Sequence, residues 1–175
     1  MRDYFIRTAR LGFGYWNPDD LPLAPGLWGD PEVTRLTEGP RSAQQVADRL
    51  AREVANRARY GYQYWPIFDV DTGAHVGCCG LQPRAPDERI CELGYQLRAD
   101  CWGRGYAKEA ARAASAYAFS EFGLAALFAG HHPENARSRR VLLSLGFRYT
   151  GEEVYPPTGE LEPAYLLRRD EFRRT

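Results

Sequence analysis

The sequence contains almost no lysine and no excess of charge of either sign. Lys108 is the only lysine among 23 basic residues, and 23 acidic residues balance them to a formal net charge of zero. A protein whose main task is to bind a nucleic-acid backbone carries a surplus of positive charge. The composition therefore argues against direct nucleic-acid binding, while it leaves room for a local basic cluster.

Long apolar runs are missing as well. The best run, 122–130, is much shorter than the roughly 20 apolar residues that a helix needs to span a bilayer. The first residues, 1–4, contain no apolar segment of the kind found in secretory signals. We therefore expect a cytoplasmic protein that has no membrane partner.

Metal-binding cysteine motifs are absent too. Cys78 and Cys79 are adjacent, Cys91 and Cys101 stand apart, and no C-x-x-C spacing occurs, which argues against a zinc ribbon or a thioredoxin-like site. Strand alternation would put His75 and Cys79 on one face and Cys78 on the other. We expect buried free thiols and no metal.

What the chain does contain suits a single globular domain covering residues 1–175. It is 44% apolar and 26% charged, and a chain of this length buries a sizeable core without cross-links. Ser42 and Gln45 have capping-box spacing, and apolar residues then recur at three- and four-residue intervals, which predicts a helix over 42–59. Residues 17–30 contain several prolines, which favours a turn or an irregular loop.

The remaining pattern changes from consecutive strands to alternating helices and strands. Predicted strands cover 4–12, 62–70, 74–82, 90–98, 124–130, 147–150 and 161–168, and further helices cover 106–122 and 134–145. The earlier strands suit an antiparallel meander and the later elements a crossover unit. We therefore predict an α/β fold in which helices pack on a mixed sheet.

The most informative segment joins the strand over 90–98 to the helix that follows. Gly103-Arg104-Gly105 stands at this junction, and the first amides of a helix have no intrahelical acceptor. Glycine lets the backbone approach a ligand closely, and the amides with the positive end of the helix dipole suit a pyrophosphate. The segment matches neither the P-loop nor the dinucleotide-binding pattern.

Together with other motifs, this segment resembles the GNAT (Gcn5-related N-acetyltransferase) superfamily, and within it the RimJ/RimL-like branch that acetylates ribosomal-protein N-termini. Trp102-Gly-Arg-Gly-Tyr-Ala107 is similar to the acetyl-CoA signature of the superfamily, with Trp102 in place of Gln or Arg. Further similar elements are Gly29-Asp-Pro-Glu-Val33, Glu92-Leu-Gly-Tyr95, Asn135-Ala-Arg-Ser138 with Leu145-Gly-Phe147, and the closing strand 165–172. The resemblance implies a mixed, mostly antiparallel sheet with a central splayed strand pair and helices on both faces.

The resemblance also implies acetyl-CoA as co-substrate, with no metal. It assigns the pantetheine arm to backbone groups of Gln96 and Leu97, and a cofactor hydrogen bond to the Asn135 side chain. The pyrophosphate would lie on the loop made of Gly103, Arg104, Gly105, Tyr106, Ala107 and Lys108. The arginines expected near the cofactor are Arg98 and, at the phosphate on the adenosine end, Arg137, Arg139 or Arg140.

Acetylation requires a group that takes a proton, because an amine attacks only when it is neutral. Alternation places Glu92, Gly94 and Gln96 on one strand face, and Gly94 would leave an opening for the amine. In the resemblance Glu92 holds the position of a catalytic base; a structural carboxylate that pairs with an arginine or caps a neighbouring loop is the open alternative. His131 and His132 titrate near neutral pH, but we expect them to be exposed polar residues.

The group that protonates the departing thiolate is less evident. The resemblance places a tyrosine on the last helix, but this chain has Leu142 there, and Ser138 is the usual substitute in this branch. Ser138 equally suits a hydroxyl that only satisfies a helix carbonyl. Because no cysteine stands in a nucleophile motif with histidine, we predict direct transfer in a ternary complex with no acyl-enzyme.

We therefore predict an N-acetyltransferase that acts on a primary amine, with a protein N-terminal α-amino group as the first choice. Acetylation of a small amine, such as an antibiotic or a polyamine, is the second hypothesis, and a non-catalytic acyl-CoA-binding sensor is the third. Acceptor-binding residues would come from 15–39 and from a loop over 149–161. The sequence leaves open whether the chain acts alone or as a homodimer.

Overall fold

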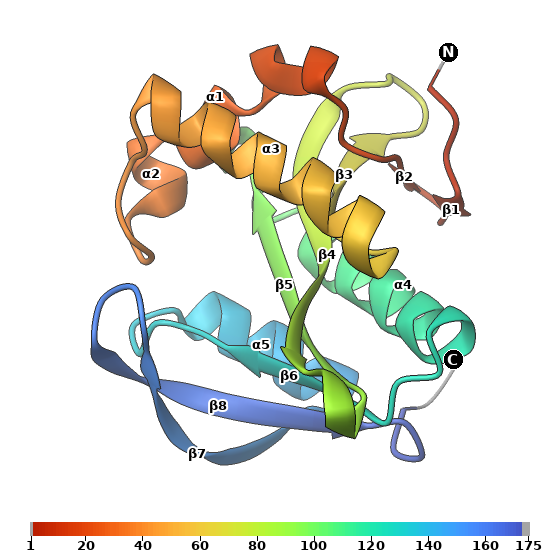
Figure 1. Cartoon of the computed structure of the whole chain (residues 1–175), viewed down its shortest axis with the longest axis vertical. Helices are drawn as coiled ribbons and strands as arrows, with labels where there is room; N and C mark the ends of the chain where they lie inside the picture. The colour runs from red at the N-terminus through yellow and green to blue at the C-terminus, as the bar shows by residue number, and fades with distance from the viewer. Residues whose placement is uncertain (1, 173–175) are drawn as a thin grey trace.

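The computed structural model describes residues 2–172, and its centre is an eight-stranded sheet with the order β1-β2-β3-β4-β5-β6-β8-β7 (Figure 1). Neighbouring strands are antiparallel except β5 and β6, which are parallel. The strands are β1 (Ile6–Arg7), β2 (Leu11–Phe13), β3 (Tyr64–Asp69), β4 (His75–Ala85), β5 (Ile90–Leu97), β6 (Ala126–Gly130), β7 (Arg148–Tyr155) and β8 (Glu160–Arg168). The predicted mixed, mostly antiparallel sheet is confirmed.

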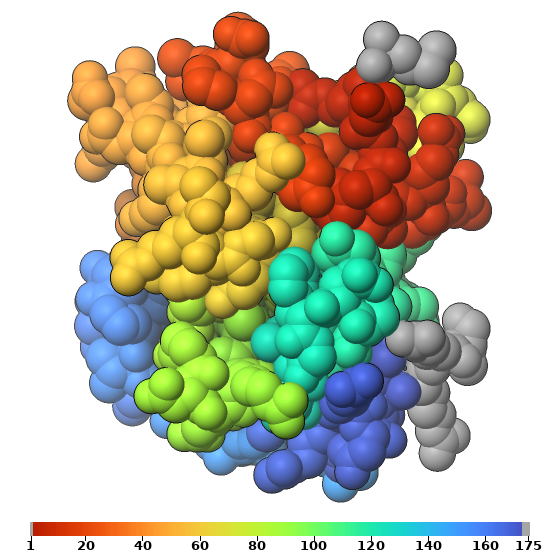
Figure 2. All heavy atoms as spheres, turned by 45° about the vertical axis from the view of Figure 1, so that its right-hand side comes forward, coloured from red at the N-terminus to blue at the C-terminus, as the bar shows by residue number. Residues whose placement is uncertain are grey.

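Helices cover both faces of this sheet. The α-helices are α1 (Pro25–Trp28), α2 (Pro31–Thr34), α3 (Ala43–Tyr60), α4 (Tyr106–Glu121) and α5 (Ala136–Leu145), with short 3-10 turns η1 (Pro18–Leu23), η2 (Pro86–Glu88) and η3 (Ala99–Cys101). One buried cluster packs α4 and α5 on the sheet, and a second packs η1, α1 and α3 on the opposite face. In the space-filling view the N-terminal segments and α3 lie above the C-terminal strands (Figure 2).

The two long helices form where their local sequence predicts them. Ser42 accepts from the Gln45 amide and the Gln45 side chain bonds back to Ser42, so the predicted capping box begins α3. Gly61 ends it in the left-handed conformation, which glycine adopts without strain. Helix α4 turns fully buried alanines to the sheet, among them Ala110 and Ala114, and these small side chains let the helix pack closely. No helix within residues 2–172 is long and apolar enough to cross a membrane.

The segment 17–30 is more regular than its prolines suggested. Asn17 caps η1 through its side chain, and Asp20 bonds back to the Asn17 backbone, which forms a second capping box. Helix α1 follows directly, with Pro25 at its first position. Short turns tolerate proline where a long helix does not, because few of their amides need an intrahelical partner. Of the two predicted alternatives, the short turn is therefore confirmed and the irregular loop was wrong.

Strand β4 corrects the predicted alternation around the cysteine pair. The ring of His75 lies 5.5 Å from that of Trp16, in whose cluster Cys78 is buried, whereas Cys79 belongs to the cluster on the opposite face. The reason is a register shift opposite Ile67 and Phe68, because such a bulge inserts one residue and reverses the faces that follow. The four cysteines are buried and free, as predicted.

The C-terminal hairpin is longer than predicted. Strand β7 continues to Tyr155 and pairs with β8 from Glu160 onward, so the expected loop over 149–161 is mostly strand. The alternation there was hidden because most of β7 is exposed and carries little apolar pattern.

A test of this architecture is Gln63, whose fully buried side chain ties the N-terminal segment to α3. Its Oε1 accepts from the Trp16 amide and its Nε2 donates to the Glu53 carbonyl, both at 2.7 Å. We predict that Gln63→Leu lowers the free energy of unfolding by about 1–3 kcal/mol, because it leaves the buried Trp16 amide without a partner and removes the second hydrogen bond of the Glu53 carbonyl, which lies inside α3. Urea unfolding measures the change. Gln44→Leu, at an exposed position on α3, should stay within about 0.5 kcal/mol, and an equal loss in both variants would contradict the assignment.

Candidate active site

The sheet opens at its centre, where β5 and β6 pair over only a short stretch. The pairs are Ile90–Ala126, Cys91–Leu127 and Glu92–Phe128. Beyond Glu92, β5 continues to Leu97 alongside β4. In Figure 1 β5 runs upright while β6 and β8 cross below it, so the two halves of the sheet diverge from this point.

The backbone of β5 alternates between facing β4 and facing this opening. The Gln96 carbonyl is turned towards Gly77 of β4, and the Arg98 amide donates to the Val76 carbonyl at 3.0 Å. Because successive residues of a strand direct their backbone groups to opposite edges, Tyr95 and Leu97 present theirs to the opening. The Gln96 backbone is therefore not at the expected position. Its side chain accepts instead from Trp28 Nε1 at 3.1 Å.

The turn before α4 leaves the first amides of the helix exposed. Gly103 and Gly105 adopt φ values of 76° and 79°, which side chains other than glycine rarely take. No side chain caps the helix at Gly105, and a Cβ built at Gly103 would meet nothing within 4 Å. Since the amides of the first helical turn lack intrahelical acceptors, this turn can accommodate an anion at the end of the opening.

A contact that the sequence did not reveal holds this turn in place. Arg10, between β1 and β2, pairs with Glu109 at 2.6 Å, and its Nη1 donates to the Arg104 carbonyl at 2.8 Å. Thr8 donates to the other Glu109 oxygen at 2.6 Å. These partners are about 100 residues away along the chain, and no local pattern connects them.

Helix α5 closes the other side of the opening. Asn135 caps it, and its Oδ1 accepts from the Ser138 amide at 3.0 Å, which leaves the Asn135 Nδ2 to donate elsewhere. Trp102 donates to the Leu97 carbonyl at 2.9 Å, and the Arg137 guanidinium lies 5.2 Å from the Trp102 ring centre. Trp102 therefore joins the turn before α4 to the end of β5 and to α5.

The Ser138 hydroxyl lies against a tyrosine that comes from the sheet. Tyr95 Oη is 2.8 Å from Ser138 Oγ and 3.3 Å from the Ser138 carbonyl oxygen. Burial raises the pKa of Tyr95, so this phenol stays protonated and can donate to Ser138. Leu142 is buried in the core. Tyr95 therefore brings a second hydroxyl, from β5, to the Ser138 hydroxyl on α5.

The predicted basic residues do not all gather at this turn. Arg104 and Lys108 are exposed beside it, and Arg139 and Arg140 are exposed on α5. Arg98 differs, because its guanidinium pairs with Asp100 at 3.2 Å and lies beside Gly26 of α1. The hydrogen bond from Arg98 lowers the pKa of Asp100.

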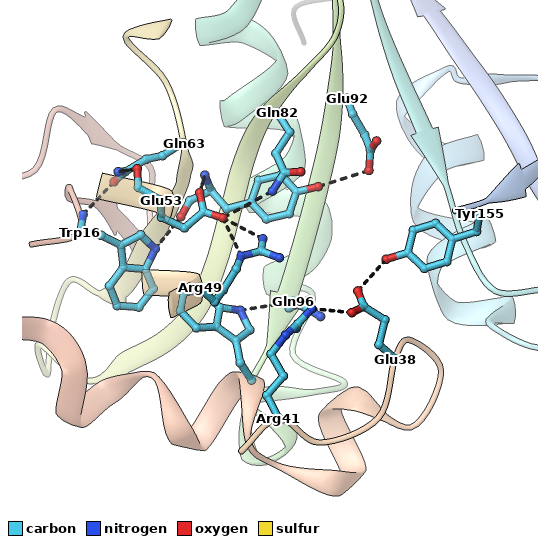
Figure 3. Close-up of polar contacts among 12 residues, drawn as sticks. Trp16, Glu38, Arg41, Arg49, Glu53, Gln63, Gln82, Glu92, Gln96 and Tyr155 are labelled. Carbon is cyan, nitrogen blue, oxygen red and sulfur yellow. Dashed lines mark hydrogen bonds and ion pairs between the residues drawn. The ribbon is translucent and has the colours of Figure 1, made fainter. Parts of the chain in front are cut away.

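A cavity of about 600 Å³ lies on the α3 side of the opening and contains Glu92. It is bounded by α3, by strands β4, β5 and β6, by α5 and by the β7–β8 hairpin, so it extends into the opening as far as Ser138. Tyr64 Oη donates to Glu92 Oε1 at 3.4 Å; Glu92 is labelled in Figure 3. A Cβ at Gly94 would overlap the Tyr64 hydroxyl. The space beside Gly94 is therefore filled by Tyr64, and an amine cannot bind there as predicted.

The environment of Glu92 favours its neutral form. Burial raises the pKa of Glu92, and the charge of Arg84, the Tyr64 hydrogen bond and the charge of Arg49 oppose that shift without cancelling it. Glu162 on β8 lines the same cavity, and burial raises its pKa too. A carboxyl group whose pKa moves towards neutrality is suited to exchanging protons.

The two histidines after β6 differ from each other. His131 is only 6% exposed, stacks on Tyr165, and has its Nε2 3.3 Å from the Tyr165 hydroxyl. Burial lowers the pKa of His131. His132 is half-buried, with its Nε2 3.6 Å from Glu160. The expected exposure was therefore wrong, because β8 folds back over the end of β6.

Comparisons with known proteins agree with this geometry. Residues 10–148 match the acetyltransferase (GNAT) domain family. The FsC-acetyl coenzyme A-N(2)-transacetylase of Aspergillus fumigatus is 36% identical, over 97% of this chain and 78% of that protein. YoaA of Bacillus subtilis, described as an uncharacterized N-acetyltransferase, is 33% identical over 83% of this chain and 84% of its own length. A GNAT-family acetyltransferase structure from Bacillus anthracis has a TM-score of 0.83 at 23% identity, covering 95% of this chain and 99% of that one.

The sheet, the opening and these matches define an acetyltransferase. The chain belongs to the GNAT acetyltransferase family.

The raised pKa of Glu92 makes a prediction about stability. The folded chain binds the Glu92 proton more tightly than the unfolded chain does. This proton therefore contributes its full stabilisation below the pKa of Glu92 in the unfolded chain, about 4.3. The contribution is lost as pH rises through the pKa of Glu92 in the folded chain. Glu92→Gln should therefore gain stability over the parent as pH rises from 5 to 8, by about 1.4 kcal/mol for each tenfold difference in proton affinity. Urea unfolding across this range measures it.

Glu109→Gln supplies a control of opposite sign. Burial would raise the pKa of Glu109, but hydrogen bonds from Thr8 and Arg10 outweigh it and lower that pKa. Its stability is present above the unfolded pKa and is lost as pH falls through the folded one, so Glu109→Gln should be the less stable protein at pH 8. The same trend in both variants would contradict the two assignments.

Proposed function

We propose that this acetyltransferase moves the acetyl group of acetyl-CoA to a primary amine by direct transfer, with both substrates bound together. The observation that carries the proposal is the opening that begins at Glu92 and Phe128, where β5 leaves β6. The uncapped first turn of α4 follows the far end of that opening, and the cavity containing Glu92 adjoins its near end. The arrangement can hold a long anionic co-substrate and an acceptor at one point.

The chain would hold acetyl-CoA through backbone groups more than through side chains. Tyr95 and Leu97 face the opening and can bond the pantetheine arm, while the amides around Gly103 and Gly105 suit the pyrophosphate. The Asn135 Nδ2 can donate a further hydrogen bond. Bound there, acetyl-CoA supplies a thioester carbonyl as the acetyl donor.

Glu92 is the proposed general base. It borders the cavity, and its raised pKa allows it to accept a proton as the amine attacks, after which it can release that proton to solvent. Tyr64 orients the carboxylate through its hydroxyl. A purely structural Glu92 would be expected to pair directly with an arginine, and Arg84, the nearest candidate on β4, pairs instead with Glu153.

Ser138 is the proposed donor to the departing sulfur. Either hydroxyl can be the donor between Tyr95 Oη and Ser138 Oγ. In the arrangement in which Tyr95 donates, the Ser138 proton is free to point into the opening. A thiol with a pKa of about 8.5 already leaves readily as a thiolate, so this hydrogen bond stabilises the product and need not transfer a full proton.

The cysteines support direct transfer without an acyl-enzyme. Burial raises the pKa of Cys78 to about 12, and it also raises the pKa of Cys79, Cys91 and Cys101. A thiol attacks a thioester as the thiolate, and these surroundings disfavour that form.

A small amine is the acceptor that the cavity supports best. The Tyr155 hydroxyl donates to Glu38 at 3.1 Å and thereby bridges the β7–β8 hairpin and the segment before α3 (Figure 3). A protein N-terminus followed by its chain would require this bridge to open. The relative named as an N(2)-transacetylase also supports the small acceptor. A protein N-terminus is the second candidate acceptor, because the segment from Trp102 to Ala107 resembles that of the branch that acetylates ribosomal-protein N-termini.

Gly103 tests the co-substrate site. Gly103→Ala should weaken acetyl-CoA binding at least about tenfold, because a strained backbone at this turn moves the amides away from the phosphates. Gly123→Ala is the matched control, since Gly123 follows the other end of α4 and also has a left-handed φ with open space around it. Isothermal titration measures both. Equal affinities for acetyl-CoA in the two variants would place the binding site elsewhere.

Glu92 tests the chemistry. Glu92→Gln should lower kcat at least about 100-fold and remove the loss of rate at low pH, while acetyl-CoA affinity stays unchanged. Glu162→Gln removes the other carboxyl of raised pKa in the same cavity and should lower kcat less than about tenfold. Release of free thiol from acetyl-CoA with a panel of amines reports the rates. If Glu162→Gln shows the larger loss, Glu162 is the base and Glu92 is structural.

A further inference from the structure

Three arginines gather at the α3 end of the cavity, a feature that the proposed transfer does not use. Arg41, Arg49 and Arg52 all line it. Glu38 engages Arg41 at 2.8 Å and accepts from Tyr155, so Arg41 is committed to that bridge. Burial lowers the pKa of Arg52, and the charge of Arg49 lowers it further. Positive charge is therefore in local excess around Arg49 and Arg52.

Arg49 is held in a fixed position by its surroundings. Its side chain is only 10% exposed, and its guanidinium lies 5.3 Å from the ring centres of both Trp28 and Tyr64. Its Nε and Nη2 each lie 2.8 Å from the same oxygen of the fully buried Glu53. In Figure 3 the guanidinium stands between Glu53 and Gln96, on the side of the sheet that carries Glu92.

One edge of this guanidinium remains unused. Nε donates to Glu53, whereas Nη2 is buried and makes no hydrogen bond although it lies 2.8 Å from the same oxygen, and no hydrogen bond from Nη1 is formed within residues 2–172. A guanidinium presents five donors, and a buried donor without a partner costs free energy. Because Arg49 lines the cavity and cannot turn away from Trp28 and Tyr64, its open edge is preorganised for an anion.

Tyr64 connects this edge to the proposed site of chemistry. Its ring contacts the Arg49 guanidinium, and its hydroxyl donates to Glu92. The Arg49 guanidinium and the Glu92 carboxyl group therefore lie on either side of the Tyr64 side chain. Glu38 and Glu153 also line the cavity, but they pair with Arg41 and Arg84. Asp48 lines a hollow shared with Arg49 and Arg52, where its carboxylate accepts from Gln44. The cavity thus has a basic end at Arg49 and an acidic end at Glu92 and Glu162.

We propose that the acceptor carries a carboxylate in addition to its amine, and that Arg49, with Arg52 at the mouth of the cavity, binds this carboxylate. The inference rests on the proposed function and specifies its substrate class as an amino acid-like small molecule. The amine would lie by Glu92 while the carboxylate lies against the open edge of Arg49.

The experiment compares ω-amino carboxylic acids, from glycine to 6-aminohexanoate, with their primary amides. For at least one chain length, kcat/KM for the acid should be at least about tenfold higher than for its amide. The affinity of the CoA-loaded protein for the acid should exceed that for the amide by the same factor, because the amide cannot form the charge-assisted hydrogen bond. Affinity is measured by isothermal titration, which does not depend on turnover. Equal affinities for acid and amide at every length would overturn the proposal.

Variants locate the effect. Arg49→Lys keeps the positive charge that pairs with Glu53 but has no further N–H groups to offer a carboxylate. The ratio of the affinity for the acid to that for the amide should therefore fall to about one. Arg52→Gln, at an exposed position, should reduce the acid-to-amide ratio by a few fold. Arg59→Gln removes a charge from the same helix outside the cavity and should leave the ratio unchanged. An unchanged ratio in Arg49→Lys, or an equal fall in Arg59→Gln, would contradict the assignment.

The two proposals fail in different ways. If amines are acetylated with no preference for the acid, the carboxylate site is wrong and the acetyltransfer stands. If acids bind more tightly than amides through Arg49 but no amine is acetylated, the carboxylate site stands and the proposed reaction is wrong.

Discussion

The structure depends on the point where β5 and β6 stop pairing. Up to Glu92 and Phe128 the sheet is continuous, and beyond them the two strands diverge. A strand edge inside a protein leaves backbone groups that need partners. Here Trp102, in the turn before α4, pairs with the Leu97 carbonyl, and α5 covers the edge without adding a strand to it. The opening, the uncapped start of α4 and the adjoining cavity all follow from this single interruption.

A second network keeps the opening from closing. Buried Glu53 binds Arg49 and also accepts from the Tyr64 amide at 2.8 Å, and Gln63 links the Glu53 carbonyl to the Trp16 amide. Breaking a buried ion pair by removing one partner costs several kcal/mol, so α3 is firmly held against β3 and β4. The same network orients Tyr64, which reaches Glu92. Packing of α3 and the geometry of the proposed base are therefore coupled.

Much of the fold could be predicted because its signals are local. The Ser42 cap, the left-handed Gly61 and the glycine turn at 103–105 are set by residues that are close in sequence, and α3 and α4 lie within a few residues of their predicted ranges. What failed depends on pairing between distant segments. The register of β5 against β4 turns the Gln96 backbone away from the opening, the β4 bulge moves His75 to the other face, and Tyr64 fills the space beside Gly94. The role of Arg10 was missed because its partners lie about 100 residues away in the sequence. The role of Arg49 was missed because an arginine on a helix is usually exposed to solvent.

The central claim is that the opening at the end of β5 and the first turn of α4 bind acetyl-CoA, and amide hydrogen exchange tests it most directly. Addition of acetyl-CoA should slow exchange at the amides of 103–108 and at Tyr95 and Leu97, because these backbone groups acquire acceptors or lose access to water. The far end of α4, around Gly123, should be unaffected. Binding of acetyl-CoA that leaves 103–108 unprotected, while other amides become protected, would contradict the account.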